Sequence, residues 1–335
     1  MLGLRTAVLL LAMLFVRPAV GDDETPALVG EVAARVGASL VAIDVASATT
    51  RVLVASTTYD RPLVWRPDGA ELLFWDHDAG AWEIHAVPAT GGDVTVLAPV
   101  AWGGSRSAVW SPDGSRLALW RTDPEGLVVR GSRGRGQTVH VAADVHRDTP
   151  AAWRPDGKAL AFEAAIPRED RLEFVLRIAV EAADGTWSVR DVGGGRPFAW
   201  IEEGRTLLVS GARTEGTLAF GRVDVERGSL QWVTPAGHED RRPVWCASRQ
   251  RVVVLRHARG SGVREVVSCS ALGADARVHA SANGPEGDLV VDPRGRWIAW
   301  REGPDEAPRL AVVPWDGGAV VRHDVAIGRE LAARP

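Results

Sequence analysis

The chain has 335 residues, a formal net charge of −4, 36 glycines, 20 prolines and 14 tryptophans. A mildly acidic chain without a clustered basic face is not expected to bind nucleic acid. Beyond the N-terminal residues, no apolar stretch is long enough to span a membrane.

The first 21 residues have the layout of a secretory signal peptide. An arginine precedes the apolar run Ala7 to Val16, which is too short to span a bilayer, and Ala19-Val20-Gly21 then provide small residues before Asp22. A retained membrane anchor is the alternative. We therefore expect a signal peptide over residues 1–21 and one exported domain, periplasmic or extracellular, over residues 22–335.

A tryptophan-initiated five-residue motif recurs along the chain, and its copies start 43 to 47 residues apart. Three copies are well formed and three are degraded. They start at Trp65 (Trp-Arg-Pro-Asp-Gly), Trp110 (Trp-Ser-Pro-Asp-Gly), Trp153 (Trp-Arg-Pro-Asp-Gly), Trp200 (Trp-Ile-Glu-Glu-Gly), Trp245 (Trp-Cys-Ala-Ser-Arg) and Val291 (Val-Asp-Pro-Arg-Gly). A period in the forties with strand-like segments between the marks is typical of a β-propeller.

Each repeat is interpreted as four short strands, which we label A to D from the axis outward. Pro67-Asp68-Gly69 is expected to form the A–B turn, because Pro restricts φ, Asp bonds its own backbone and Gly accepts a positive φ. Short strands bounded by such turns are typical of all-β proteins. Residues 31–36 are the best helix candidate, but they are few. In the first repeat the strands are expected over residues 61–65, 71–75, 82–87 and 93–97.

Strands C and D recur seven times, whereas strand A with its turn occurs six times. The phase of the repeats places the missing A strand near Leu331 to Pro335. We expect the N-terminal segment to supply strands B, C and D of one blade and the C-terminus to supply its strand A. Such closure protects the sheet edges of the ring. Seven blades are preferred, and a six-bladed ring with an extra N-terminal hairpin is the alternative.

The segments Trp110-Ser-Pro-Asp-Gly-Ser-Arg-Leu-Ala-Leu-Trp and Trp153-Arg-Pro-Asp-Gly-Lys-Ala-Leu-Ala-Phe resemble the TolB-type, WD-like propeller repeat. The resemblance covers nearly all of residues 22–335 and implies the fold more specifically than the function. In that family TolB itself carries an α/β domain before its propeller and docks with a peptidoglycan-associated lipoprotein. Here we expect the propeller without that α/β domain. Similar repeats precede the hydrolase domain of prolyl-oligopeptidase-like enzymes, but no Gly-x-Ser-x-Gly nucleophile elbow occurs in this sequence.

Charged residues recur four and five positions ahead of the motif starts. Equivalent positions of a propeller form rings around its axis, so these residues are expected to line one mouth of the central channel. Arginines in such a ring can hold carboxylates through paired hydrogen bonds. Local loop capping by Asp, with Arg pairing nearby, is the alternative. The candidate binding residues are Asp60, Arg61, Arg106, Asp148, Arg196, Asp240, Arg241 and Glu286.

Two histidines, His146 and His238, each stand two residues ahead of an Asp of this ring. Histidines and carboxylates at one channel mouth can hold a metal ion. These two loops belong to blades that are not adjacent, and no ligand spacing supports coordination. No metal and no other cofactor is therefore predicted, and no catalytic residue is assigned.

The two cysteines, Cys246 and Cys269, are expected to be free and buried. Cys246 follows the innermost strand of its blade, and Cys269 lies on the third. Non-neighbouring strands lie about 10 Å apart, beyond the Cα–Cα reach of a disulfide at about 7 Å. A disulfide formed after export is the alternative.

These observations favour an exported, monomeric, non-enzymatic propeller that binds a protein or peptide partner at a charged channel mouth. One alternative is a metal-dependent hydrolase or lyase with its site in the channel. Another is a structural module of the cell envelope. The aspartates of the Pro-Asp-Gly turns are expected to serve those turns, and the motif tryptophans to pack where blades meet.

Overall fold

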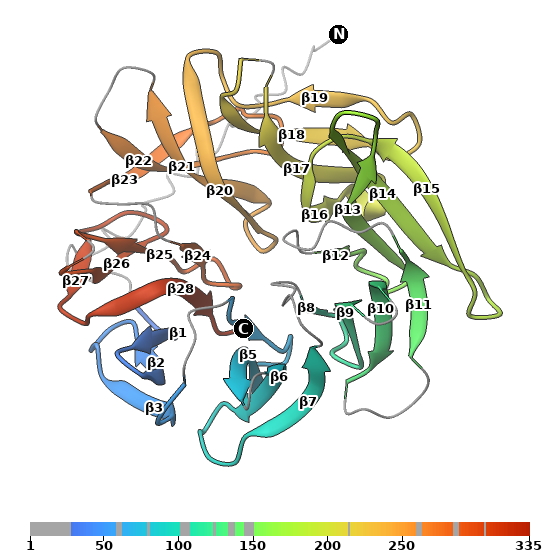
Figure 1. Ribbon diagram of the computed structural model, residues 1–335. Helices are drawn as coiled ribbons and strands as arrows, with labels where there is room; N and C mark the ends of the chain where they lie inside the picture. Colours follow the sequence, from blue (N-terminus) through green and yellow to red (C-terminus); the bar gives the residue numbers. More distant parts are fainter. Residues whose placement is uncertain are drawn as a thin grey trace, which may run out of the picture.

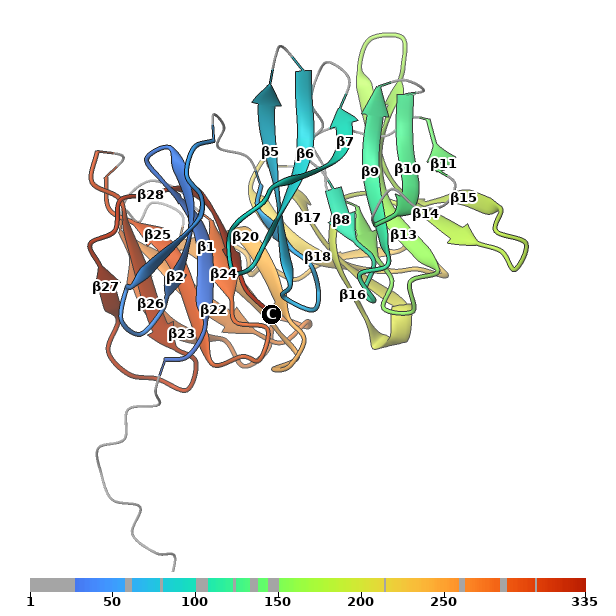
Figure 2. The same ribbon diagram turned by 90° about the horizontal axis from the view of Figure 1, so that it is seen from below.

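Seven antiparallel sheets of four strands each form a ring in the computed structural model (Figure 1). Seen from the side, the strands of the first sheets run along the axis of the ring (Figure 2). The predicted all-β, seven-bladed propeller is confirmed. The structure describes residues 28–57, 62–78, 81–100, 108–122, 125–132, 138–143, 151–213, 215–258, 263–283, 288–304 and 306–335.

We number the blades 1 to 6 in chain order from β4, and blade 7 closes the ring. The innermost strands, in blade order, are β4 (Val64–Trp65), β8 (Ala108–Trp110), β12 (Ala152–Trp153), β16 (Arg196–Ile201), β20 (His238–Cys246), β24 (Leu289–Val291) and β28 (Ile327–Ala333). The second strands are β5 (Glu71–Asp78), β9 (Arg116–Thr122), β13 (Ala159–Pro167), β17 (Thr206–Ala212), β21 (Arg251–Ala258), β25 (Trp297–Glu302) and β1 (Glu31–Val36). The third strands are β6 (Ala81–Pro88), β10 (Glu125–Gly131), β14 (Leu172–Glu181), β18 (Leu218–Asp224), β22 (Arg264–Cys269), β26 (Arg309–Pro314) and β2 (Ser39–Asp44). The outermost strands are β7 (Thr95–Val100), β11 (Val139–Ala142), β15 (Trp187–Gly193), β19 (Leu230–Trp232), β23 (Arg277–Ala282), β27 (Val321–His323) and β3 (Thr50–Val54).

Blade 7 is assembled from the two ends of the described chain, as predicted. Its sheet has the order β28-β1-β2-β3, so the last strand of the chain pairs with the first. The pairing is antiparallel, with Val32 opposite Ala333 and Ala33 opposite Ala332. Residues 31–36, the best helix candidate in the sequence, therefore form strand β1, because the closing blade needs a second strand at that place.

The core is divided among the seven junctions between adjacent blades. Each junction contains one cluster of buried apolar side chains drawn from both of its blades. Strands that lie between two such clusters are buried on both faces, and every residue of β25 is buried. A single blade would leave both apolar faces in water, so the blades stabilise one another only as a ring.

The Pro-Asp-Gly segments form the turns predicted for them. Gly69, Gly114 and Gly157 have φ of 69°, 67° and 71°, a region that disfavours any side chain. In the first turn, Asp68 Oδ1 accepts a hydrogen bond from the backbone N–H of Ala70 at 3.0 Å. The degraded copy at Trp200 forms a short 3₁₀-helix instead, η1 (Glu202–Gly204), before the chain enters β17.

Three motif tryptophans join their blade to the preceding one, which confirms their predicted place at the junctions. In each case the indole N–H donates to a backbone carbonyl of the preceding blade. The acceptor residue stands directly before the residue at the first motif position in that blade. These bonds run from Trp65 Nε1 to Ala332 O (3.1 Å), from Trp153 Nε1 to Val109 O (3.2 Å) and from Trp200 Nε1 to Ala152 O (2.8 Å). The bond from Trp65 lies at the seam between blades 7 and 1.

Arginines reach in the opposite direction at three junctions, two of which also have the indole bond, from one blade to a turn glycine of the next. The contacts run from Arg334 Nε to Gly69 O (3.0 Å), from an Arg116 amino group to Gly157 O (2.5 Å) and from Arg249 Nε to Gly295 O (2.8 Å). Arg334 and Arg116 also lie over the motif tryptophans of the next blade, 5.5 and 5.1 Å from the ring centroids. Each junction of this kind therefore carries a backbone bond and a cation–π contact.

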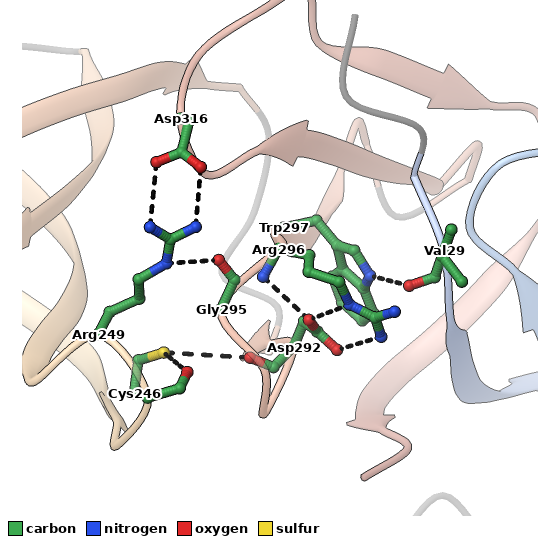
Figure 3. Close-up of polar contacts among 9 residues, drawn as sticks. Val29, Cys246, Arg249, Asp292, Gly295, Arg296, Trp297 and Asp316 are labelled. Carbon is green, nitrogen blue, oxygen red and sulfur yellow. Dashed lines mark hydrogen bonds and ion pairs between the residues drawn. The ribbon is translucent and has the colours of Figure 1, made fainter.

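Figure 3 shows this arrangement between blades 5 and 6. Arg249 donates to Gly295 O and forms a two-pronged ion pair with Asp316. Beyond them, Trp297 donates to the carbonyl of Val29, two residues before β1 of blade 7. One small region thus links three consecutive blades.

Both cysteines are free and buried, in agreement with the strand-spacing argument. Cys246 Sγ lies 3.4 Å from the Ser248 hydroxyl and 4.0 Å from the carbonyl oxygen of Asp292. Burial raises the pKa of the Cys269 thiol to about 11. Cys269 is therefore a core side chain and a poor nucleophile at neutral pH.

Replacing Arg334 should loosen the seam of the ring. Arg334→Ala removes the bond to Gly69, the cation–π contact with Trp65 and an ion pair with Glu31. We expect the free energy of unfolding in urea to fall by about 2 kcal/mol. Arg227→Ala is the control, because Arg227 is exposed and its side chain has no hydrogen bond or ion pair with a described residue. Equal stability of the two variants would contradict the role given to Arg334.

Candidate functional site

A cleft of about 860 Å³ lies at one end of blade 4, flanked by strands of blades 3 and 5. We call it the blade 4 cleft. It takes residues from β13 and β14, from all four strands of blade 4, and from β20. Its lining residues are Glu163, Phe174, Gly194, Gly195, Arg196, Ser210, Gly211, Ala212, Leu218, Ala219, Leu230, Trp232, Asp240, Arg241, Arg242 and Pro243.

Three of the predicted binding residues, Arg196, Asp240 and Arg241, line this cleft together. They come from the innermost strands of two adjacent blades, as the repeat spacing implied. The charged ring as a whole stays a prediction. The other five predicted residues, Asp60, Arg61, Arg106, Asp148 and Glu286, lie outside the residues that the structure describes.

The strands of blades 4 and 5 begin earlier than the motif spacing suggested. Arg196 is the first residue of β16, and Asp240 and Arg241 lie inside β20 rather than in a loop before it. The reason is that β21 continues to Ala258, which pairs with His238 at the start of β20. Within a strand, neighbouring side chains point to opposite faces, so Asp240 and Arg241 have different surroundings.

Asp240 is buried and bonds inside its own blade. Its two carboxylate oxygens accept hydrogen bonds from Arg256 Nε at 2.7 Å and from an Arg256 amino group at 2.8 Å. Burial acts to lower the pKa of Arg256, but the hydrogen bonds and charge of Asp240 outweigh it and raise that pKa overall. Asp240 therefore supports the wall of the cleft from within.

Arg196 and Arg241 each stand over a carboxylate. Arg196 Nε lies 3.3 Å from Glu163 Oε2, and an amino nitrogen of Arg241 lies 3.0 Å from Glu239 Oε2. The side chain of Glu163 is only 6% exposed, whereas that of Arg196 is 56% exposed. The carboxylate is thus covered, and the guanidinium faces the cleft.

Arg242 completes a group of three cleft arginines and has an unusual backbone. Its φ is 51°, in the left-handed region, and it sits where the pairing of β20 with β21 shifts between Arg241 and Val244. Such a bulge re-aims side chains, and positive φ in a non-glycine residue carries strain that is common at functional sites. Arg242 is half-exposed and lies 3.4 Å from Asp288, which also accepts the backbone N–H of Leu331 in β28.

The wall of the cleft that is formed by third and outermost strands is apolar, whereas the arginines come from innermost strands. Phe174, Leu218 and Leu230 are all exposed there. The half-buried Trp232 lies across Gly211 so closely that a Cβ at Gly211 would stand 3.0 Å from the indole. The absence of a side chain at Gly211 thus lets Trp232 line the cleft together with these apolar side chains.

Sequence reasoning missed Glu163, Arg242 and Trp232. Glu163 had a signal, because it is an acidic residue within the otherwise apolar strand β13. Arg242 directly follows a predicted residue, but the bulge that turns its side chain outward left no mark in the repeat pattern. Trp232 lies outside the motif, at the end of an outermost strand.

Among the described residues, no group of three or more His, Cys, Asp or Glu side chains is placed to hold a metal ion. His238 contacts the carbonyl of Ala236 at 3.2 Å. His146 lies outside the described part of the chain. In the same part, no helix is long and apolar enough to cross a membrane.

Comparison with known proteins shows similarity at the level of structure. No family model and no curated protein matches the sequence. Among solved structures, TolB from Acinetobacter baumannii superposes with a TM-score of 0.58 and 14% identity, covering 92% of this chain and 67% of that one. The chain folds as a TolB-like seven-bladed propeller.

The same fold occurs in proteins with other activities. An oligogalacturonate lyase in complex with manganese has a TM-score of 0.64 and 14% identity over 88% of this chain and 85% of its own. The propeller domain of the trilobed protease from Pyrococcus furiosus has a TM-score of 0.61 and 12% identity, covering 88% of this chain and 94% of its own. That domain has an open velcro topology, whereas the TolB-like ring described above pairs β28 with β1. The shared fold does not select one activity.

Removing the carboxylate of Asp240 should destabilise the wall of the cleft strongly. Asp240→Leu leaves the guanidinium of Arg256 buried without its partner, and we expect a loss of about 3 kcal/mol in the free energy of unfolding. Asp240→Leu combined with Arg256→Met should recover most of that loss. Asp191→Leu breaks the exposed pair with Arg177 and should cost less than about 1 kcal/mol. A double variant as unstable as the single one would refute this account.

Proposed function

We propose that this TolB-like propeller is an exported, non-enzymatic protein that binds a protein or peptide partner in the blade 4 cleft. The observation that carries the proposal is the facing of two unlike walls. Arg196, Arg241 and Arg242 stand on one side, and exposed apolar side chains with Trp232 stand on the other. A peptide that carries acidic and apolar side chains close together would satisfy both walls.

The arginines are arranged to bind carboxylates. Their side chains are 34 to 56% exposed, whereas the carboxylates beside them are 6 to 19% exposed. A guanidinium has five N–H donors, and the ion-pair contact of Arg196 or Arg242 uses one nitrogen. The covered carboxylates hold the guanidinium groups in place, so less side-chain entropy is lost when a ligand binds.

The apolar wall favours a peptide over a small anion alone. Aromatic side chains supply contact area at low entropic cost and are enriched where proteins bind one another. Phe174, Leu218 and Leu230 add exposed apolar surface around Trp232. The cleft volume of about 860 Å³ lies within the range of ligand-binding clefts in general.

Selection from a random peptide library tests this proposal. We expect the protein to enrich peptides with Asp or Glu next to Leu, Phe or Trp, and to bind them less tightly as salt is raised. Arg196→Ala with Arg242→Ala should weaken binding of an enriched peptide by about tenfold or more, measured by fluorescence anisotropy. Trp232→Ala should weaken it as well.

Matched controls are available on the rest of the surface. Arg227 and Arg294 are exposed arginines that do not line the cleft, so replacing them by Ala should leave peptide affinity unchanged. If the enriched peptides lack acidic residues, or if the cleft and control variants bind equally well, the cleft is not the partner site.

Export is part of the same proposal and rests on the N-terminal segment. Residues 1–21 lie outside the described part of the chain, and their pattern of charge, apolar run and small residues is the support. Expressed with its leader in a bacterial host, the protein should be recovered from the periplasm or medium with its N-terminus near Asp22. Mass spectrometry of the intact protein measures this, and retention of all 21 residues would argue for an anchor.

A further inference from the structure

A second cavity, of about 200 Å³, lies on the face of blade 5 that is turned toward blade 6. It is lined by Glu239, Arg241, Leu255, His257 and Arg264. Leu255 at its base belongs to the apolar cluster shared by blades 5 and 6, which places the cavity at that junction. It shares Arg241 with the blade 4 cleft, and its Glu239 accepts a hydrogen bond at 3.2 Å from the backbone N–H of Leu218, which lines that cleft.

Strand register brings the polar groups of this cavity together. Glu239 of β20 lies opposite His257 of β21, and His257 lies opposite Arg264 of β22. Arg241 stands two residues from Glu239 on the same face, opposite Leu255. Side chains directly opposite one another have Cβ atoms about 5 Å apart, so these groups converge on one small space.

Among the described residues that line this space, arginines outnumber carboxylates. Glu239 is engaged by Arg241, whose guanidinium approaches its carboxylate through two nitrogens. His257 and Arg264 are both half-buried, yet neither has a hydrogen bond or an ion pair with any described residue. Arg227, which also lacks a side-chain contact within the described chain, is exposed, where water solvates it. A half-buried guanidinium without a counter-ion is costly, and a bound anion removes that cost.

We propose that this cavity binds a small oxyanion, the carboxylate or phosphate group of a ligand. Arg264 is the principal donor, and Arg241 and the His257 ring stand beside it. The volume of about 200 Å³ equals that of about six or seven water molecules, which suits one such group and excludes a peptide segment. The fork of an arginine matches the geometry of both carboxylate and phosphate. This site does not depend on peptide binding in the cleft.

Calorimetric titration of the full-length protein with inorganic phosphate, and separately with acetate, tests the proposal at constant ionic strength. We expect saturable binding of at least one of the two anions to one site. Arg264→Gln should weaken that binding by about tenfold or more, because it removes the charge and the fork. His257→Gln keeps a hydrogen-bond donor and should weaken it less.

Arg227→Gln is the matched control, and its anion affinity should equal that of the unmodified protein. Preference for phosphate or for acetate identifies which oxyanion the site takes, and either preference supports the site. Absence of saturable binding for both anions would overturn it, and so would equal binding by the Arg264 and Arg227 variants. If Arg264→Gln fails to fold, Arg264→Lys keeps the charge without the fork and should still weaken binding. Since no peptide is present, these results are independent of the peptide experiment.

Discussion

The ring depends on the burial of both apolar faces of every blade, and at three junctions a hydrogen bond from a motif indole to the innermost strand of the preceding blade aligns the two blades. Trp153 and Trp200 make this bond at internal junctions, and Trp65 makes it to Ala332 at the seam. Each blade has two apolar faces and stays folded only between two neighbours. At these junctions the bond fixes the position of one blade's innermost strand relative to the next. The seam between blades 7 and 1 has the same bond as the two internal junctions.

That equivalence explains how an apparently poor strand closes the ring. Since Ala332 holds the place of the residue before the motif, Ala333-Arg334-Pro335 occupy the positions of Trp, Arg and Pro in the repeat. Arg334 then lies over Trp65 as Arg66 lies over Trp110, 5.5 and 5.7 Å from the ring centroids. Counting residues along the chain was enough to predict where the strand lies. The composition of this segment did not predict a strand, because Ala333 stands where most of the other repeats have tryptophan. Pairing with β1 holds the segment in the extended conformation.

Counting residues from the repeated motif predicted less of the candidate site than of the fold. Spacing from the motif found Arg196, Asp240 and Arg241, but it treated them as equivalent members of a ring. In β20 a step of one residue reverses the face, so Asp240 is buried against Arg256 while Arg241 lies beside Glu239, opposite Leu255. The bulge at Arg242 and the closeness of Trp232 to Gly211 arise from contacts between strands, and a one-dimensional period does not contain them.

Arginines have different roles on the two faces of this ring. The role depends on which acceptors bind the N–H donors of the guanidinium. At the turn end, Arg334 and Arg116 donate to glycine carbonyls and lie on tryptophans, so they hold blades together. At the end where strand A begins, Arg196 stands over the covered carboxylate of Glu163 instead. A carboxylate positions a guanidinium without enclosing it, which leaves donors directed outward. The same residue type is therefore structural where backbone oxygens surround it and available to a ligand where only an acid lies beneath it.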